Sequence, residues 1–231
     1  MKMIYRWVSV TTVVLVGSVW GGEKVEIFDG SSFESWKAPE MSYWSIEDGS
    51  ITATSSEANP CTKNQFLVWQ GGEVSDFVLK LKFRVDGGQK ANSGIQVRSQ
   101  IQEDGHVVGY QIDIAQPGAP YLGAIYDEHG RKMLAQRGEI TTVTAEGSME
   151  KEMVGESAGK AIKSYTPGEW SEYEITAKGD KITVKLNGHR TSEVIDLQVA
   201  ERELSGLLAL QLHSGPPMKV QFKDIVLKPL N

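Results

Sequence analysis

The chain has 231 residues, of which 40% are hydrophobic and 23% charged, and its formal net charge is -6. With 24 glycines and 8 prolines, this composition is that of a globular protein and excludes collagen-like and disordered chains. The acidic balance argues against a nucleic-acid partner, because neutralising phosphates requires clustered Lys and Arg side chains.

Residues 1–22 form a predicted secretory signal peptide, followed by a single predicted domain over residues 23–231. Lys2 and Arg6 precede an uncharged run from Trp7 to Trp20 and then small residues. The run is shorter than the roughly 20 apolar residues that span a bilayer, which favours cleavage over a retained anchor. We therefore expect a periplasmic or secreted protein with no integral membrane domain after cleavage. Cys61 is the only cysteine, so an intrachain disulfide is excluded.

The periodicity after residue 22 is almost entirely that of β-strands. From Phe77 to Val85, apolar residues alternate with mainly charged ones. The pairs Asp48-Gly49 and Asn187-Gly188 are typical of tight hairpin turns. The same alternation recurs in residues 94–98, 110–114, 173–178, 181–186, 207–213 and 220–227, the last with a change of phase at 223–224. The pattern predicts an all-β sandwich of two antiparallel sheets.

Residues 138–164 interrupt this pattern, because they contain few large apolar side chains and several glycines. We expect a long excursion over the surface, with a short helix around residues 148–154. A loop of this length can be a functional lid or a mobile insertion, and the sequence leaves both open.

Strand phase gathers polar side chains on one face of the predicted sheet. They are Gln96, Arg98, Gln111, Asp113, Gln211 and His213. If their strands are neighbours, this face forms a groove whose amide, guanidinium, carboxylate and imidazole groups suit sugar hydroxyls. The alternative is the ordinary polar outer face of an antiparallel sheet.

Motifs in a fixed order along the chain resemble those of one enzyme family. They include Asn92-Ser93-Gly94-Ile95-Gln96, Gly109-Tyr110-Gln111 with Asp113, Tyr126-Asp127-Glu128 with Arg131, and Gly206-Leu207 through Gln211 and His213. With further matches from Phe28 to Leu230, nearly the whole mature chain resembles the 3-keto-disaccharide hydrolase family. That family is also described as 3-keto-glucoside 1,2-lyase and 3-keto-2-hydroxy-glucal hydratase.

The resemblance implies a concanavalin A-like jelly-roll sandwich and an enzyme that acts on 3-keto-glycosides, and the predicted signal peptide implies that this enzyme is exported. The implied reaction is β-elimination across C1–C2, followed by hydration of the 2-hydroxy-glucal, which amounts to hydrolysis. Its carbohydrate substrate could come from a separate sugar 3-oxidoreductase. The same fold and polar face would also serve a noncatalytic, lectin-like carbohydrate-binding module, and a structural or adhesion domain is a third alternative.

Elimination from a 3-keto sugar requires a base near C2, a group that stabilises the enolate oxygen, and an acid for the leaving group. His213 is the first candidate for proton transfer, because imidazole titrates near neutrality. Asp113 could be the base, the partner of His213 or a metal ligand, and Glu128 is a third catalytic candidate. Each candidate has a structural alternative. His213 could be an ordinary surface histidine, Asp113 could form a salt bridge with Arg98, and Glu128 could lie in a solvated acidic turn.

A second set of side chains could hold the substrate. Arg98 and Arg131 could bind enolate or sugar oxygens, or could form structural ion pairs. Tyr126 could stack on a sugar ring. The predicted substrate-binding residues are Asn92, Gln96, Arg98, Gln111, Tyr126, Asp127, Arg131 and Gln211. His213, Asp113 and Glu128 could bind a divalent cation. The chain has no compact His or Cys ligand motif, however, so no cofactor is assigned.

Overall fold

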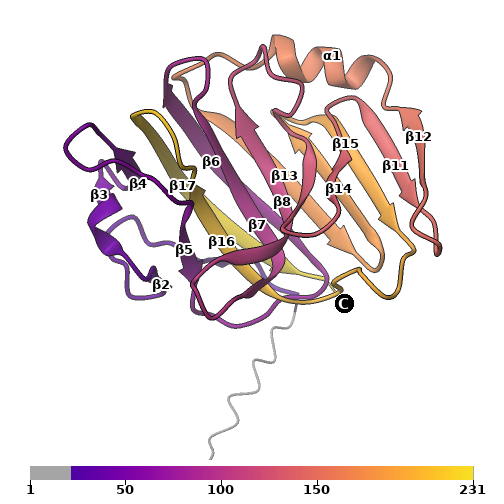
Figure 1. Cartoon of the computed structure of the whole chain (residues 1–231), viewed down its shortest axis with the longest axis horizontal. Coiled ribbons are helices and arrows are strands. Elements are labelled where there is room, and N and C mark those ends of the chain that lie inside the picture. The colour runs from indigo at the N-terminus through magenta and orange to yellow at the C-terminus, as the bar shows by residue number, and fades with distance from the viewer. Residues whose placement is uncertain (1–21, 231) are drawn as a thin grey trace, which may run out of the picture.

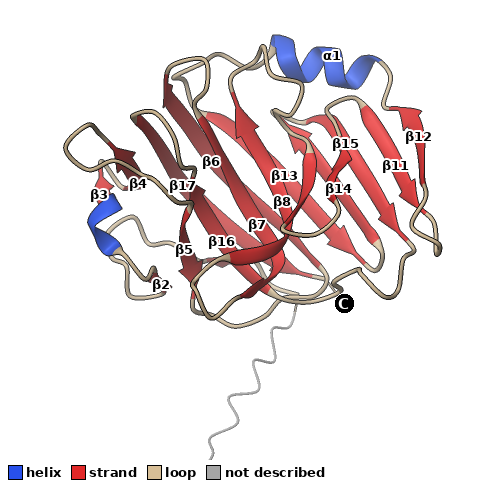
Figure 2. Cartoon of the chain, viewed as in Figure 1, coloured by secondary structure: helices blue, strands red, loops and turns tan. Residues whose placement is uncertain are grey.

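The computed structural model describes residues 22–230, which form two β-sheets packed face to face (Figure 1). Apart from Gly22, the predicted signal peptide lies outside the described residues. Among residues 22–230, no helix is long and apolar enough to cross a bilayer. Strands dominate the described part of the chain, and its single α-helix, α1 (Glu156–Lys163), lies at one edge of the sandwich (Figure 2).

The first sheet has ten strands and is antiparallel except where β11 and β15 run parallel. Its order is β12 (Met149–Met153), β11 (Glu139–Val143), β15 (His189–Asp196), β14 (Lys181–Leu186), β13 (Ser171–Lys178), β6 (Phe77–Gly87), β17 (Met218–Pro229), β4 (Ser50–Ser55) and β3 (Trp44–Glu47), with β1 (Val25–Glu26) on β17. A single 3₁₀ turn, η1 (Met41–Tyr43), precedes β3.

The second sheet has seven strands and is antiparallel throughout. Its order is β10 (Lys132–Ala135), β9 (Ile125–Glu128), β8 (Val107–Ala115), β7 (Asn92–Ile101), β16 (Leu207–Leu212), β5 (Gln65–Trp69) and β2 (Trp36–Lys37). Strands β8, β7 and β16 are therefore neighbours, which confirms the adjacency that the predicted polar face requires.

The core lies between the sheets and follows from the alternation of the sequence. In β6, Phe77, Leu79, Leu81, Phe83 and Val85 are buried, while the residues between them are partly exposed. The second sheet contributes a facing set: Ile95, Val97, Tyr110, Ile112, Ile114, Leu208, Leu210 and Leu212. Burying each large apolar side chain stabilises the fold by about 1.5–3 kcal/mol, so this interface is the main source of stability.

Both predicted hairpin turns are confirmed. Asp48 and Gly49 join β3 to β4, with φ values of 49° and 71°. Asn187 and Gly188 join β14 to β15, with φ values of 48° and 80°. Two successive residues with positive φ define the turn that matches the twist of a two-residue hairpin. The predicted change of phase is also confirmed, because the register of β17 shifts between Lys223 and Val226.

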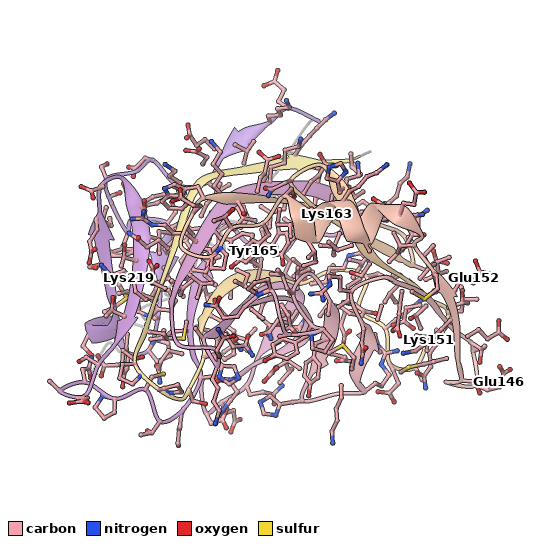
Figure 3. All side chains as sticks on the ribbon, turned by 90° about the horizontal axis from the view of Figure 1, so that it is seen from above. Glu146, Lys151, Glu152, Lys163, Tyr165 and Lys219 are labelled. Atoms are coloured by element: carbon pink, nitrogen blue, oxygen red, sulfur yellow. The ribbon has the colours of Figure 1, made fainter. Side chains whose placement is uncertain are left out.

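The prediction for residues 138–164 is wrong in its secondary structure. Residues 149–153 form strand β12 rather than a helix, and the helix α1 follows at 156–163. Every residue of β12 is exposed, so this edge strand lacks the alternation by which buried strands are recognised. Figure 3 shows the charged side chains of Lys151 and Glu152 at this rim. The segment thus extends the first sheet rather than forming a lid.

Candidate active site

The second sheet carries a polar set of side chains on the face turned away from the core. In β8, Ile112 and Ile114 point into the core, so Gln111 and Asp113 point outward. On the neighbouring β9, Tyr126 is in register with Gln111 and follows the same face. Alternation therefore fixes the orientation of these groups before any specific contact is considered.

A pocket of about 280 Å³ lies on this face. It is lined by Asn92, Gln111, Asp113, Tyr121, Tyr126, Glu128, Met133 and His213. The three predicted catalytic residues thus share one pocket with three of the predicted substrate-binding residues. Carboxylates, an imidazole, phenols and two amides converge there, which is the inventory that proton transfer on a polyhydroxylated ligand requires.

Asp113 is the most perturbed acid in this pocket. Its side chain is 5% exposed, and burial raises its pKa to about 7. A hydrogen bond from Gln111 to Oδ1, of 2.8 Å, opposes this rise, whereas the negative charge of Glu128 adds to it. A carboxyl group that titrates near neutrality inside a pocket is suited to act as a general base.

His213 follows β16, and a network of local contacts fixes its position. Its Nδ1 lies 2.6 Å from the carbonyl oxygen of Ser214, and the amide of Ser214 donates to Oδ1 of Asn64 at 2.9 Å. A carbonyl can only accept, so Nδ1 is the donor and Nε2 is the acceptor of the neutral ring. Because Nδ1 is already engaged, Asp113 does not orient His213 through that atom.

Two predicted binding residues support the pocket from behind rather than lining it. Gln96 and Gln211 are fully buried, and the Nε2 atom of each donates to Oε1 of Gln111, at 3.0 and 2.8 Å. Their amides therefore act on the pocket only through Gln111.

The expected placement of Arg98 on the polar face is wrong. Arg98 has a φ of 49° in a β-bulge, where the register of β7 and β8 shifts, so the side chain points to the other side of the sheet. It is 1% exposed and donates to the carbonyls of Ser75 and Gly179 and to the carboxylate of Asp76, at 2.7–2.9 Å. It forms a structural ion pair, and Asp113 has no contact with it.

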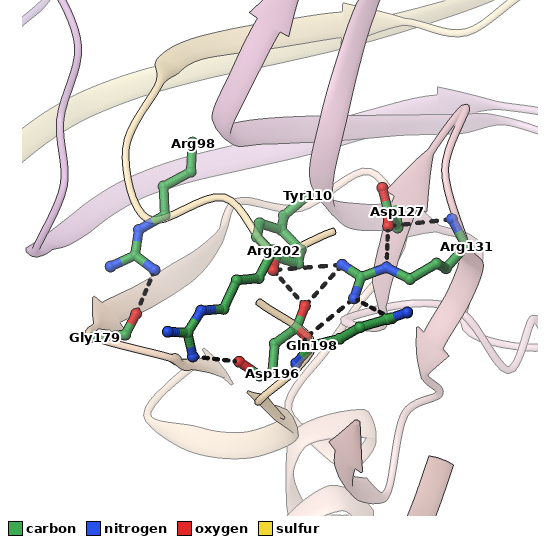
Figure 4. Close-up of polar contacts among 8 residues, drawn as sticks. All are labelled: Arg98, Tyr110, Asp127, Arg131, Gly179, Asp196, Gln198 and Arg202. Atoms are coloured by element: carbon green, nitrogen blue, oxygen red, sulfur yellow. Dashed lines mark hydrogen bonds and ion pairs between the residues drawn. The ribbon is translucent and has the colours of Figure 1, made fainter. Parts of the chain in front are cut away.

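Asp127 and Arg131 also point away from the pocket, contrary to their predicted role. Asp127 is in register with Tyr110, a core residue, and accepts from Nε of Arg131 at 2.7 Å. Arg131 in turn pairs with Asp196 of the opposite sheet, which also accepts a hydrogen bond from the Tyr110 hydroxyl (Figure 4). These residues form an ion network between the sheets. Arg131 therefore has the structural ion-pairing role that the sequence left open as the alternative to substrate binding.

The structure does not bring the three candidate metal ligands into one coordination site. His213, Asp113 and Glu128 line the same pocket, but no three His, Cys, Asp or Glu side chains within residues 22–230 lie close enough to hold a metal ion.

Two residues that line the pocket, Tyr121 and Met133, were missed from the sequence. Tyr121 lies in the β8–β9 connection, where no periodic signal marks it. Met133 pairs with Tyr126 across the β9–β10 hairpin, so that pairing could have placed it on the same face. Gly94 leaves room for Gln111, because a Cβ there would lie 2.5 Å from Cδ of Gln111.

A larger hollow, of about 780 Å³, adjoins the pocket at Glu128, which lines both. Its walls come from the β7–β8 and β9–β10 turns and from the segment before β16. They carry Glu103, Asp104, His106, Asp127, His129, Glu201 and Glu203, among others. Burial raises the pKa of Glu203 to about 7. Within the described part of the chain, Glu128 is the one residue that lines both hollows.

Several solved structures share this architecture. A candidate glycosyl hydrolase from Parabacteroides distasonis has 23% identity and a TM-score of 0.60, over 90% of this chain and 100% of that one. A carbohydrate-binding module from Bacillus subtilis has 12% identity and a TM-score of 0.55, over 84% and 95%. A Bacillus subtilis protein with a galectin-like fold has 8% identity and a TM-score of 0.60, over 89% and 94%. At these identities the likeness shows the fold alone, which confirms the predicted jelly roll.

The family model of the 3-keto-alpha-glucoside-1,2-lyase-like domain matches residues 23–228. Fold and family together define a carbohydrate-active jelly-roll protein. The chain belongs to the 3-keto-alpha-glucoside-1,2-lyase-like family, which confirms the resemblance found in its motifs. Among curated proteins, no sequence matches significantly.

Proposed function

We propose that this protein is an exported enzyme that cleaves 3-keto-glucosides by β-elimination and hydrates the resulting 2-hydroxy-glucal. The observation that carries the proposal is Asp113, a buried carboxyl group with a pKa raised to about 7, which shares a pocket with His213 and Glu128. The family match supports the substrate class, and the signal-like sequence of residues 1–22 supports export.

The 3-keto group makes the hydrogen at C2 acidic, and the Asp113 carboxylate removes it. Negative charge then develops on the oxygen at C3, where a hydrogen-bond donor lowers the barrier. Tyr126 lines the pocket, and its pKa is raised by burial and by the charges of Glu128 and Asp113. It therefore stays protonated at neutral pH and can donate to the enolate oxygen.

Loss of the leaving group completes the elimination. The enolate electrons form the C1–C2 double bond as the bond from C1 to the glycosidic oxygen breaks. His213 gives a proton to that oxygen from Nε2, which is a donor in the protonated ring and an acceptor in the neutral one. The same atom can then take a proton from water.

Hydration reverses the proton movements. Water activated by His213 adds to C1, and Asp113 returns a proton to C2. The net result is hydrolysis of the glycosidic bond, with no covalent enzyme intermediate. The hollow beyond Glu128 accommodates the leaving group, and a separate oxidoreductase must supply the keto sugar.

The test is to incubate the mature protein with a 3-keto-glucoside and follow aglycone release and the 2-hydroxy-glucal by mass spectrometry. We expect release from the keto sugar and none from the unoxidised glucoside. Asp113→Asn should reduce the rate at least about 100-fold, because it removes the base, and His213→Ala should also lower it. Asp224→Asn, at an exposed pair on the opposite sheet, is the matched control.

Turnover that is unaffected by Asp113→Asn would overturn the assigned base. Saturable sugar binding in calorimetry, with no turnover of several keto-glycosides, would make the protein a noncatalytic carbohydrate-binding module.

A further inference from the structure

Three buried glutamines on adjacent strands of the second sheet meet at one point. Gln96 on β7, Gln111 on β8 and Gln211 on β16 are 0%, 3% and 0% exposed. Burying polar amides destabilises a fold unless each finds hydrogen-bond partners, so three amides gathered at and behind one wall of a pocket require an explanation.

Their hydrogen bonds all run in one direction. The hydroxyl of Ser99 donates to Oε1 of Gln96 at 2.7 Å, and Nε2 of Gln96 donates to Oε1 of Gln111 at 3.0 Å. A second donor, Nε2 of Gln211, reaches the same Oε1 at 2.8 Å. Because two donors hold Oε1 of Gln111, its amide cannot rotate without losing both bonds.

This orientation leaves Nε2 of Gln111 to face Asp113, where it donates to Oδ1 at 2.8 Å. Within residues 22–230, this is the only hydrogen bond that the Asp113 carboxylate makes. The second oxygen, Oδ2, is left without a protein donor.

The other ionisable groups in the pocket offer Asp113 no fixed positive partner. Glu128 and Tyr126 approach from β9, Tyr121 from the preceding loop, and His213 from the end of β16. Only His213 can become a cation, and within the described residues it forms no hydrogen bond or ion pair with the Asp113 carboxylate. The amide of Gln111 is thus the one fixed dipole directed at this carboxylate.

We propose that Gln111 is a positioning residue for Asp113, fixed by Gln96 and Gln211, which holds Oδ1 and thereby selects Oδ2 as the atom that takes the substrate proton. This inference deepens the proposed function, because it assigns the machinery behind the same base. The alternative is that the three amides only satisfy one another as part of the fold.

The experiment measures Asp113 itself. Protein labelled with ¹³C at the aspartate carboxyl groups is titrated by NMR, and the Asp113 signal is assigned by its absence in Asp113→Asn. In Gln111→Met, which keeps the length of the side chain but removes the amide, the pKa of Asp113 should rise by about 1, because the charged form loses its donor. The acid limb of the pH profile of kcat/KM should move to higher pH together with this pKa.

Gln96→Met should shift the Asp113 pKa in the same direction by less, because one of the two clamps on Gln111 remains. Gln221→Met is the matched control: Gln221 is a buried glutamine of the first sheet, bonded to Thr52 and Arg84, and its loss should leave Asp113 unchanged. Thermal unfolding verifies that each variant is folded.

An unchanged Asp113 titration in folded Gln111→Met and Gln96→Met protein would overturn the inference and leave the amides with a structural role. The NMR readout needs no substrate. A shifted pKa without turnover of any keto-glucoside would therefore reject the proposed function while retaining the role of Gln111.

Discussion

The guanidinium of Arg131 and the carboxylate of Asp196 form an ion pair between the two sheets, with Nη2 2.7 Å from Oδ2. Asp127 binds the other side of the same guanidinium, and both carboxylates are nearly buried, at 5% and 2% exposure. The pair therefore connects the β9–β10 turn to the end of β15.

Arg131→Ala should destabilise the protein strongly, because it leaves two buried carboxylates without their cation. We expect the free energy of unfolding in urea to fall by about 3–5 kcal/mol. Lys82→Ala, which breaks the exposed pair with Asp224, should cost less than about 1 kcal/mol. A variant of Arg131 with normal stability and weakened sugar binding would instead support the role first expected from the sequence.

Strand alternation predicted much of the candidate site. It placed Gln111, Asp113 and Gln211 correctly, because the apolar residues between them belong to the core. The same rule, applied to β9, would have separated Glu128 and Tyr126 from Asp127, since neighbouring residues of a strand face opposite sides. Asp127 and Glu128 were instead both expected to face the substrate, although they are adjacent in one strand.

The misplacement of Arg98 has a different cause. A bulge adds one residue to a strand and reverses the phase beyond it, and the sequence carries no glycine at that position to mark it. The hydrogen bonds among the three glutamines also could not be predicted from the sequence, because they depend on the register of β7 against both β8 and β16.

Gly94→Ala should disturb the pocket although it adds one methyl group. The new Cβ would lie 2.5 Å from Cδ of Gln111, which must then move away from Asp113. We expect a loss of stability of about 1–3 kcal/mol and a marked fall in turnover. Gly88→Ala, at a site with no atom within 4 Å of the added Cβ, is the control for losing a glycine. Equal effects of the two substitutions would exclude a steric role for Gly94.

Under the proposed mechanism, the rate of 3-keto-glucoside cleavage should rise with pH through about 7. Asp113 acts as a base only when it is ionised, and burial has raised its pKa to about 7. The acid limb of kcat/KM, which reports the free enzyme, should therefore have its midpoint near that value. A midpoint near 4 would indicate a carboxylate that is solvated in the functioning protein, and would argue against Asp113.

Asp113→Asn should inactivate the enzyme and stabilise it at alkaline pH. The folded protein holds the Asp113 proton up to about pH 7, whereas the unfolded chain releases it near 3.8. As pH rises between these values, the unfolded state loses its proton first, so the wild-type free energy of unfolding falls, and this penalty is complete only above pH 7.

Asparagine has no such ionisation, yet its side-chain oxygen can still accept the hydrogen bond from Gln111. Relative to wild type, the variant should therefore gain about 2–3 kcal/mol more at pH 8 than at pH 5, measured by urea unfolding. Asp224→Asn, at an exposed site, should show no comparable gain. If the gain in the free energy of unfolding is the same at both pH values, then burial does not oppose the ionisation of Asp113 in the folded protein. The assignment of Asp113 as a base with a pKa near neutrality would then fail.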